Sequence, residues 1–144
     1  MALPTQLQLN IVSPDRSLVD EQVDEVEIPG SVGYFGVLPG HTPLLARLGS
    51  GDLWYRRGQD VKHLAIAFGF VEVQPDRVTV LARIAERAED IDLSRAEAAK
   101  KRAEERLVHP TIDIDAERAR IALLKSLTRI QVASRAHAHA ADRS

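Results

Sequence analysis

The first half of the chain alternates hydrophobic and polar residues with a period close to two. In LQLNIV, Leu7, Leu9 and Ile11 alternate with polar neighbours, and VDEVEIP continues the pattern less regularly. HLAIAFGFVEVQ and RVTVLARI are rich in valine, isoleucine and phenylalanine. These segments predict β-strands. The turn-forming sequences between them are SPDR, PGSVG, LPGH, GSGD, RRGQD and QPDR.

The strand-like pattern extends from Gln6 to Ala82 without an intervening helical pattern. Because parallel strands are usually joined by crossover helices, this favours antiparallel pairing over βαβ units. Short strands at this spacing are typical of a sandwich or a barrel. We therefore expect an N-terminal antiparallel β-sandwich over residues 1–86.

From about Asp90 the pattern becomes that of a helix. IDLSRAEAAKKRAEERL is dense in alanine, glutamate, lysine and arginine, which are strong helix formers. Ser94 with Glu97 fits a capping box, and Asp92 is an alternative N-cap. The segment VHPTIDID predicts a break in the helix at His109–Pro110.

A second helix is expected from about Asp113 or Asp115 to about Ser134, with a frayed tail from about residue 135. Residues 87–144 would then form a two-helix antiparallel hairpin. Its apolar seam contains Leu93, Ala96, Ala99, Ala103 and Leu107 on the first helix and Ala116, Ala119, Leu123, Leu127 and Ile130 on the second. Because a buried alanine contributes less apolar area than a leucine, we expect this hairpin to detach and open at modest cost.

The composition is that of an ordinary globular protein, with 44% hydrophobic residues, 28% charged residues and a formal net charge of −2. There is thus no whole-chain basic signature for nucleic acid. The absence of cysteine excludes disulfides, thiolate nucleophiles and cysteine-based zinc sites. The sequence has no apolar run long enough for a membrane span and no signal-peptide pattern. We expect a cytoplasmic protein that does not insert into a membrane directly.

Catalytic motifs are absent from the sequence. GxSxG, HExxH and P-loop patterns do not occur, and no pair of carboxylates is singled out by its spacing. His137 and His139 have a spacing that could chelate a metal, but a solvated tail is the favoured interpretation and no metal is expected. His41 and His63 have no partner that the sequence identifies. An enzyme built from this chain alone is therefore not expected.

The segment PGSVGYFGVLPGHTPLL, residues 29–45, combines many glycines and prolines with more apolar residues than loops usually contain. Glycine lets a partner approach the backbone closely, and aromatic residues such as Tyr34 and Phe35 are common anchors of interfaces. We interpret the segment as a contact surface. The alternative is a plain hairpin turn that packs on its own sheet.

These segments together resemble the epsilon subunit of bacterial F-type ATP synthases. The similarity runs in register from about Leu7 to Val132, through VEIPGSVGYFGVLPGHTPLL, FGFVEVQPDRVTVLA, AERAEDIDLSRAEAAKKRAEERL and DIDAERARIALLKSLTRIQVA. It implies a non-catalytic rotor subunit whose sandwich binds the gamma subunit and the c-ring, which couples c-ring rotation to ATP synthesis. It also implies helices that inhibit ATP hydrolysis, and a peripheral location at the cytoplasmic face of the bacterial cell membrane.

The resemblance assigns two sets of contact residues. The c-ring contact would be made by Ser31, Val32, Tyr34, Phe35 and His41. Tyr34 stands where the family often has an acidic residue, so a salt bridge carried over from the family is in doubt at this position. The inhibitory contact with the alpha and beta catalytic subunits would be made by cations of the helices, namely Lys100, Lys101, Arg102, Arg106, Arg118, Arg120 and Lys125. Such contacts would weaken as salt is added.

The segment IDLSRA is similar to the ATP-binding signature of some members of this family. The resemblance implies a site formed by Glu86, Asp92, Arg95, Arg102, Lys125 and Arg129. The two arginines of the first helix share a face, as do the two cations of the second, so a folded hairpin would gather them around a triphosphate. Lys125 stands where ATP-binding members have arginine. ATP would be a regulatory ligand rather than a required cofactor; solvated pairs of charges along the helices are the alternative.

Three other classes of function compete with this interpretation. The first is a free-standing ATP-sensing module made of the same sandwich and hairpin, without partner subunits. The second is a carbohydrate-binding sandwich, which is disfavoured because the chain has one tryptophan and two tyrosines to serve as sugar platforms. The third is an enzyme, which would require turnover by the isolated chain.

Overall fold

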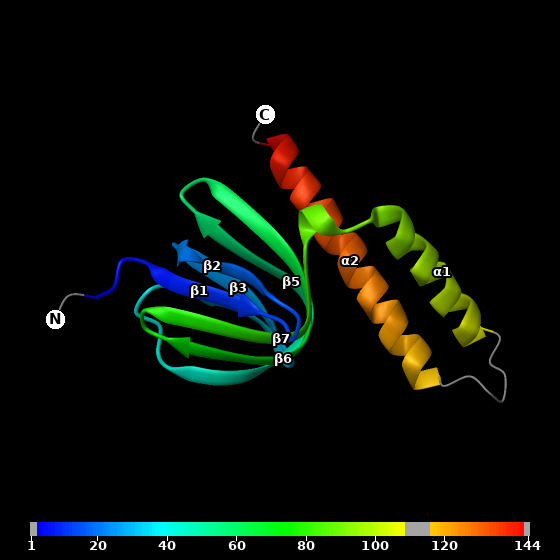
Figure 1. Ribbon diagram of the computed structural model, residues 1–144, viewed down its shortest axis with the longest axis horizontal. Helices are drawn as coiled ribbons and strands as arrows, with labels where there is room; N and C mark the ends of the chain where they lie inside the picture. Colours follow the sequence, from blue (N-terminus) through cyan, green and yellow to red (C-terminus); the bar gives the residue numbers. More distant parts are fainter. Residues whose placement is uncertain (1–2, 109–115, 143–144) are drawn as a thin grey trace.

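A computed structural model describes residues 3–108 and 116–142 of the chain. These residues form a β-sandwich followed by two helices, which confirms the fold class predicted from the sequence. In Figure 1, α2 lies against the sandwich and α1 packs on the far side of α2. The strands are β1 (Leu7–Val12), β2 (Ser17–Val23), β3 (Glu25–Gly30), β4 (Gly33–Val37), β5 (Leu44–Arg57), β6 (Asp60–Gln74) and β7 (Arg77–Arg87). The helices are the 3₁₀ helix η1 (Ala88–Asp90), α1 (Leu93–Val108) and α2 (Ala116–Asp142).

The strands form one continuous sheet in the order β2-β1-β7-β6-β5-β3-β4, which folds over to enclose a core. Neighbouring strands are antiparallel except β1 and β7, which run parallel from the Gln8–Arg77 pair to the Val12–Leu81 pair. The parallel pair departs from the antiparallel pairing expected from the sequence. It is possible because β1 and β7 are far apart along the chain, so no tight hairpin dictates their relative direction.

The alternation read from the sequence places one face of each strand in the core. Leu7, Leu9 and Ile11 on β1 are fully buried, as their pattern predicts. Strand β6 instead contains a continuous buried run. Ile66 belongs to the sandwich core, whereas Ala65 packs against α2, so both faces of β6 are covered at this point.

Strand β5 runs without a break through GSGD, where the sequence predicted a turn. The prediction was wrong because these glycines serve a close approach between strands. A Cβ atom on Gly51 would collide with the Tyr34 hydroxyl group and crowd the Pro29 side chain. The glycine-rich sequence therefore lets the β3–β4 hairpin lie directly across β5.

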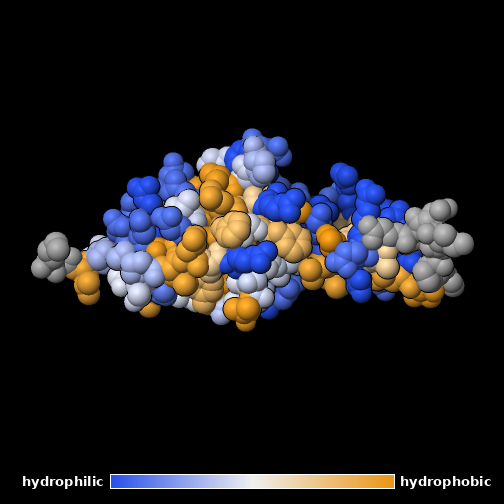
Figure 2. Space-filling model, turned by 90° about the horizontal axis from the view of Figure 1, so that it is seen from below, coloured by the Kyte–Doolittle hydropathy of each residue, from blue (hydrophilic) through white to orange (hydrophobic). Residues whose placement is uncertain are grey.

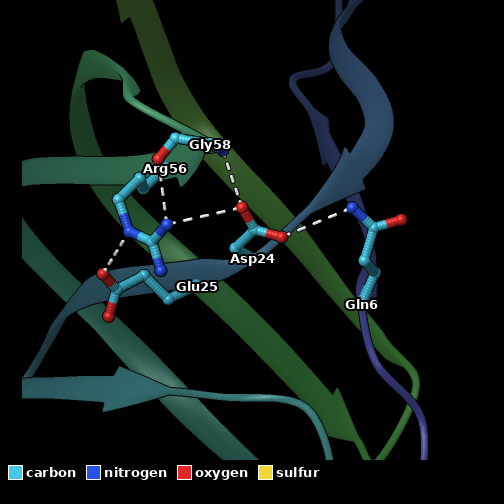
Figure 3. A network of polar contacts seen from close by, with 5 residues as sticks. All are labelled: Gln6, Asp24, Glu25, Arg56 and Gly58. Carbon is cyan, nitrogen blue, oxygen red and sulfur yellow. Dashed lines mark hydrogen bonds and ion pairs between the residues drawn. The ribbon is translucent and has the colours of Figure 1, made fainter.

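A network of polar contacts ties the β5–β6 turn to the junction between β2 and β3 (Figure 3). Asp24 accepts hydrogen bonds from the Gly58 N–H at 2.6 Å and from Gln6 Nε2 at 3.3 Å. Arg56 Nη1 lies 3.4 Å from Asp24, and Arg56 Nε donates to Glu25 at 2.8 Å. The Gly58 N–H, then the Gln6 amide and the Arg56 charge, hold the pKa of Asp24 below its ordinary value, although desolvation opposes this.

Helix α1 begins after Asp92, whose Oδ1 accepts a hydrogen bond from the Arg95 N–H at 3.1 Å. The N-cap is therefore the alternative that the sequence analysis named, and the capping box at Ser94 is wrong because Ser94 lies inside the helix. The helix break and the second helix start that were predicted between His109 and Asp115 lie outside the described residues.

Helix α2 continues to Asp142, so the predicted end near Ser134 and the frayed tail from residue 135 are wrong. The C-terminal half of α2 is supported by the sandwich, which the sequence pattern did not reveal. Val132 is fully buried, and Ala136 packs with it against Ala65 and Ala88.

The seam between the helices is partly as predicted. Ala96 and Ala103 on α1 and Ala119 on α2 are buried, whereas Leu93 and Leu127 are exposed. The remaining predicted positions, Ala99, Leu107, Leu123 and Ile130, are half-buried, and Ala116 is exposed. Ser126 and Thr128 are buried in their place, because α2 packs against both α1 and the sandwich and so uses two faces.

Candidate functional site

The middle of α2 is attached to the sandwich by two polar contacts. Arg129 Nε lies 2.8 Å from Glu86 Oε2 on β7, and Arg129 Nη2 donates to Glu86 Oε1 at 3.1 Å. The hydroxyl groups of Thr128 and Ser50 share a hydrogen bond of 2.9 Å. Only the Nη2 contact has the geometry of a hydrogen bond, since the buried Arg129 Nε has no hydrogen-bond partner among the described residues. The ion pair and the hydroxyl contact join α2 to β7 and β5.

A cavity of about 250 Å³ lies between α2 and the sandwich beside these contacts. Glu86, Lys125 and Arg129 all line it, together with apolar residues of β6. The structure thus brings together three of the six residues that the sequence analysis assigned to ATP. An anionic ligand in this cavity would compete with Glu86 for the guanidinium group of Arg129.

The other three residues assigned to ATP lie in α1 or directly before it. Asp92 caps the helix, and Arg95 and Arg102 are exposed on it. Within the described residues, none of the three lines the 250 Å³ cavity. The ATP site therefore stays a prediction, with half of its side chains gathered at one cavity.

A second polar cluster, which the sequence analysis missed, lies nearer the C-terminal end of α2. The carboxylate of Asp52 on β5 is fully buried. His63 Nδ1 on β6 lies 3.0 Å from each carboxylate oxygen, and Arg135 Nη1 on α2 lies 3.3 Å from Oδ2. Asp52 was hidden in a predicted turn and Arg135 in a predicted tail. The available signal was His63, a histidine inside a strongly apolar strand.

The five residues assigned to the c-ring contact lie in and after the β3–β4 hairpin. Val32, at its tip, is fully exposed, and Ser31 beside it is exposed as well. Tyr34 is half exposed, but its hydroxyl accepts a hydrogen bond from a backbone N–H of β5 at 3.1 Å. Phe35 packs against the sandwich core, and His41 Nδ1 donates to the carbonyl of the next residue at 2.6 Å. The hairpin therefore packs on its own sheet through Phe35 and presents Val32 to the outside.

A hydrophobic recess opens where the pairing of β6 is interrupted at Phe68. Phe68 has a φ of 63°, and Gly69 a φ of 120° at which a Cβ atom would collide with the Leu81 carbonyl. The recess measures about 510 Å³. Phe70 and Leu81, which help to line it, are 51% and 53% exposed. Figure 2 shows that hydrophobic side chains also gather in patches on one face of the sandwich.

The cations assigned to the inhibitory contact lie along the helices. Lys100 Nζ lies 3.9 Å from Glu104, and Arg120 donates to Glu117 at 2.7 Å. These two pairs are of the solvated intrahelical kind that the sequence analysis gave as the alternative. The exposed members of the set are Lys101, Arg102, Arg106, Arg118 and Arg120.

Over residues 3–108 and 116–142, no helix is long and apolar enough to cross a membrane. In the same part of the chain, no group of three histidine, cysteine or acidic residues is arranged to hold a metal ion.

The fold and these surfaces define a protein of two parts, a β-sandwich with surface recesses and a helical hairpin that docks on it through polar contacts. The chain belongs to the ATP synthase delta/epsilon chain family. Residues 6–88 match the family's beta-sandwich domain, and residues 89–134 match its long alpha-helix domain. The family expected from the sequence is confirmed.

Relatives of known name cover nearly the whole chain. The ATP synthase epsilon chain of Solibacter usitatus is 44% identical over 133 residues, which are 92% of this chain and 99% of the relative. ATP synthase epsilon chain 2 of Syntrophotalea carbinolica is 50% identical over 131 residues, which are 90% of this chain and 95% of the relative.

A chain in the cryo-EM structure of the Euglena gracilis mitochondrial ATP synthase has a similar fold. It gives a TM-score of 0.79 at 24% identity, over 89% of this chain and 81% of that chain. At this identity the likeness speaks for the fold alone.

Proposed function

We propose that this chain is a non-catalytic central-stalk subunit of a proton-translocating F-type ATP synthase. Its sandwich binds the gamma subunit and the c-ring, so that it turns with the rotor and helps to couple c-ring rotation to ATP synthesis. Its helices leave the sandwich and contact the alpha and beta subunits, which inhibits ATP hydrolysis. Within the complex the chain lies at the cytoplasmic face of the bacterial cell membrane, as a peripheral subunit. Family membership across both domains supports this proposal.

The exposed hydrophobic recess is the observation that carries the proposal. Phe70 and Leu81 each leave about half of their surface in solvent beside a cavity of about 510 Å³. Contiguous exposed apolar surface often marks a site where another protein binds. An aromatic anchor beside a pocket is typical of such interfaces. We assign this surface to the gamma subunit. Arg47 and Arg83, which also line the recess, would then meet acidic groups of gamma.

The β3–β4 hairpin supports the second contact of the proposal. Val32 projects fully into solvent from a turn that is fixed on both sides by strand pairing. The Ser31 N–H also donates to the Arg47 carbonyl on β5 at 2.9 Å, so the tip is held rigidly. A rigid tip loses little entropy on binding, which suits a contact with the polar loops of the c-ring.

Binding of the gamma subunit tests the proposal. Phe70→Ser combined with Leu81→Ser should weaken the copurification of gamma by at least about tenfold, because two hot-spot truncations at an interface each cost more than ~1 kcal/mol. The matched control is Leu124→Ser combined with Leu127→Ser, which changes two half-exposed leucines of α2. Equal affinity of the Phe70–Leu81 variant and the wild type would contradict the assignment.

We further propose that ATP is a regulatory ligand that stabilises the docked hairpin. The cavity lined by Lys125 and Arg129 supports this, because its cations lie on the helix that would have to move. Charged phosphate groups bind arginine in pairs of hydrogen bonds, so the triphosphate would bind Arg129. This would release Glu86 to accept hydrogen bonds from the base or the ribose. A ligand that binds the docked state alone shifts the hairpin toward that state.

Calorimetric titration of ATP into the full chain tests this second proposal. Lys125→Ala should weaken binding by at least about tenfold, because one charge-assisted hydrogen bond contributes about 1.5–3 kcal/mol. Arg120→Ala, which removes a cation of the same helix outside the cavity, should leave binding unchanged. The absence of binding by the wild type up to millimolar ATP would contradict the proposal, as would equal losses in the two variants.

A further inference from the structure

The C-terminal half of α2 has little apolar surface with which to hold the sandwich. Val132 and Ala136 pack against Ala65 and Ala88, so most partners in this contact are alanines. A cavity of about 310 Å³ also lies between this part of α2 and the sandwich. Because burial of apolar area drives docking at ~25 cal/mol per Å², small side chains beside a cavity supply a weak attachment.

The polar contact at this end of α2 differs from this weak apolar contact, because it involves a carboxylate, that of Asp52, which is completely removed from solvent. Asp52 pairs with Ala65 across the β5–β6 ladder, which puts His63 on the same face, two residues away. Both side chains are buried when α2 is docked, whereas the side chain of Arg135 is 51% exposed. Arg135 thus reaches the buried carboxylate from the solvent side.

We propose that Asp52, His63 and Arg135 form an electrostatic latch that sets how firmly the C-terminal half of α2 docks on the sandwich. Docking removes Asp52 from water, which is costly, and the contacts with His63 and Arg135 offset that cost. When α2 leaves, water takes over the solvation of Asp52. The loss of Arg135 therefore penalises the docked state alone.

Other ionisable groups lie near the latch. Lys62, Glu89 and His137 line the neighbouring cavity, from β6, η1 and α2. Arg87 on β7 is directed elsewhere, since its Nη2 donates to the Leu18 carbonyl at 2.6 Å. Over residues 3–108 and 116–142, the arginine that meets Asp52 comes from α2. The latch needs no partner subunit, whereas its use in regulation rests on the proposed function.

Hydrogen exchange in the full chain, without partner subunits, tests the latch. In Arg135→Gln the backbone amides of residues 130–140 should exchange at least about tenfold faster, because the buried carboxylate has lost a charged partner. The matched control is Arg120→Gln, which removes an equal charge from the exposed pair with Glu117 on the same helix. It should leave those amides unchanged.

The combination with Asp52→Asn completes the test. Asparagine carries no charge that needs an arginine, so Arg135→Gln added to Asp52→Asn should accelerate exchange far less than about tenfold. The amides of β6 and β7 should keep wild-type rates in all variants. Equal rates in Arg135→Gln and Arg120→Gln would overturn the latch. So would additive effects of the two latch substitutions, or an equal acceleration throughout the sandwich. None of these outcomes depends on binding to an ATP synthase.

Discussion

The Tyr34 hydroxyl accepts a hydrogen bond from the Asp52 backbone N–H at 3.1 Å. The pairing of β3 with β5 shifts between Glu27 and Gly30, so this stretch of β5 lacks a regular strand partner on that side. A side chain of β4 therefore supplies the acceptor that the ladder does not. Because Asp52 also carries the carboxylate that meets Arg135, one residue contacts both the exposed hairpin and the docked helix.

Tyr34→Phe should reduce the free energy of unfolding by about 1 kcal/mol, since it leaves a backbone N–H without its acceptor while it keeps the ring. Chemical denaturation followed by the fluorescence of Trp54, the single tryptophan, measures this change. An unchanged midpoint would show that solvent replaces the tyrosine hydroxyl at no cost.

Gly51→Ala should be strongly destabilising, by about 1–3 kcal/mol or more, because the new methyl group meets the Tyr34 hydroxyl and Pro29. Gly36→Ala is the matched control, because a Cβ atom there has no neighbour within 4 Å. Thermal unfolding of the two variants compares them directly. Equal melting temperatures would mean that the hairpin does not press on β5 in solution.

The contribution of Asp24 should depend on pH. Its folded-state pKa lies below the ordinary value of 3.8, chiefly because the Gly58 N–H binds the carboxylate. The stabilisation is therefore present above about pH 4 and is lost as the pH falls through the folded-state pKa. Asp24→Asn should be less stable than the wild type at pH 7, and their melting temperatures should converge as the pH falls below the folded-state pKa of Asp24. A difference that stays constant across this range would contradict the network.

Asp92→Ala should destabilise α1 by about 1 kcal/mol, because the Arg95 N–H loses its side-chain acceptor. Ser94→Ala should have a much smaller effect, since Ser94 lies inside the helix. Amide exchange of the first turn of α1 distinguishes the two. A larger effect from Ser94→Ala would restore the capping box as the start signal of the helix.

Much of the fold could be predicted from periodicity. Leu7, Leu9 and Ile11 alternate because one face of β1 is buried, and that signal is local. The course of β5 through Gly51 could not be predicted from the sequence. A glycine is needed there because the Tyr34 side chain lies against it, and only the fold brings the two residues together. The parallel β1–β7 pair was missed for the same reason, since its two strands are neighbours in the sheet but far apart in the sequence.

The candidate sites also differ in whether local spacing or the fold brings their residues together. Lys125 and Arg129 share a helix face, so their proximity at one cavity could be predicted from spacing. The contact of Arg135 with Asp52 could not, because neither residue carries a local pattern and their meeting depends on the path of α2 across the sheet. The end of α2 was misplaced because alanine and histidine gave no apolar stripe beyond Ser134, while the supporting surface lies on the sandwich.

The most direct test of the proposed function is to lock α2 on the sandwich. The chain has no cysteine, and the hydroxyl oxygens of Ser50 and Thr128 lie 2.9 Å apart, so Ser50→Cys with Thr128→Cys should form a disulfide there. ATP hydrolysis would be measured in ATP synthase assembled with this variant, oxidised and then reduced, with each single cysteine variant as a control. We expect the oxidised complex to hydrolyse ATP without inhibition. After reduction, inhibition of ATP hydrolysis should return. Equal inhibition in both states would contradict a regulatory role for the release of α2.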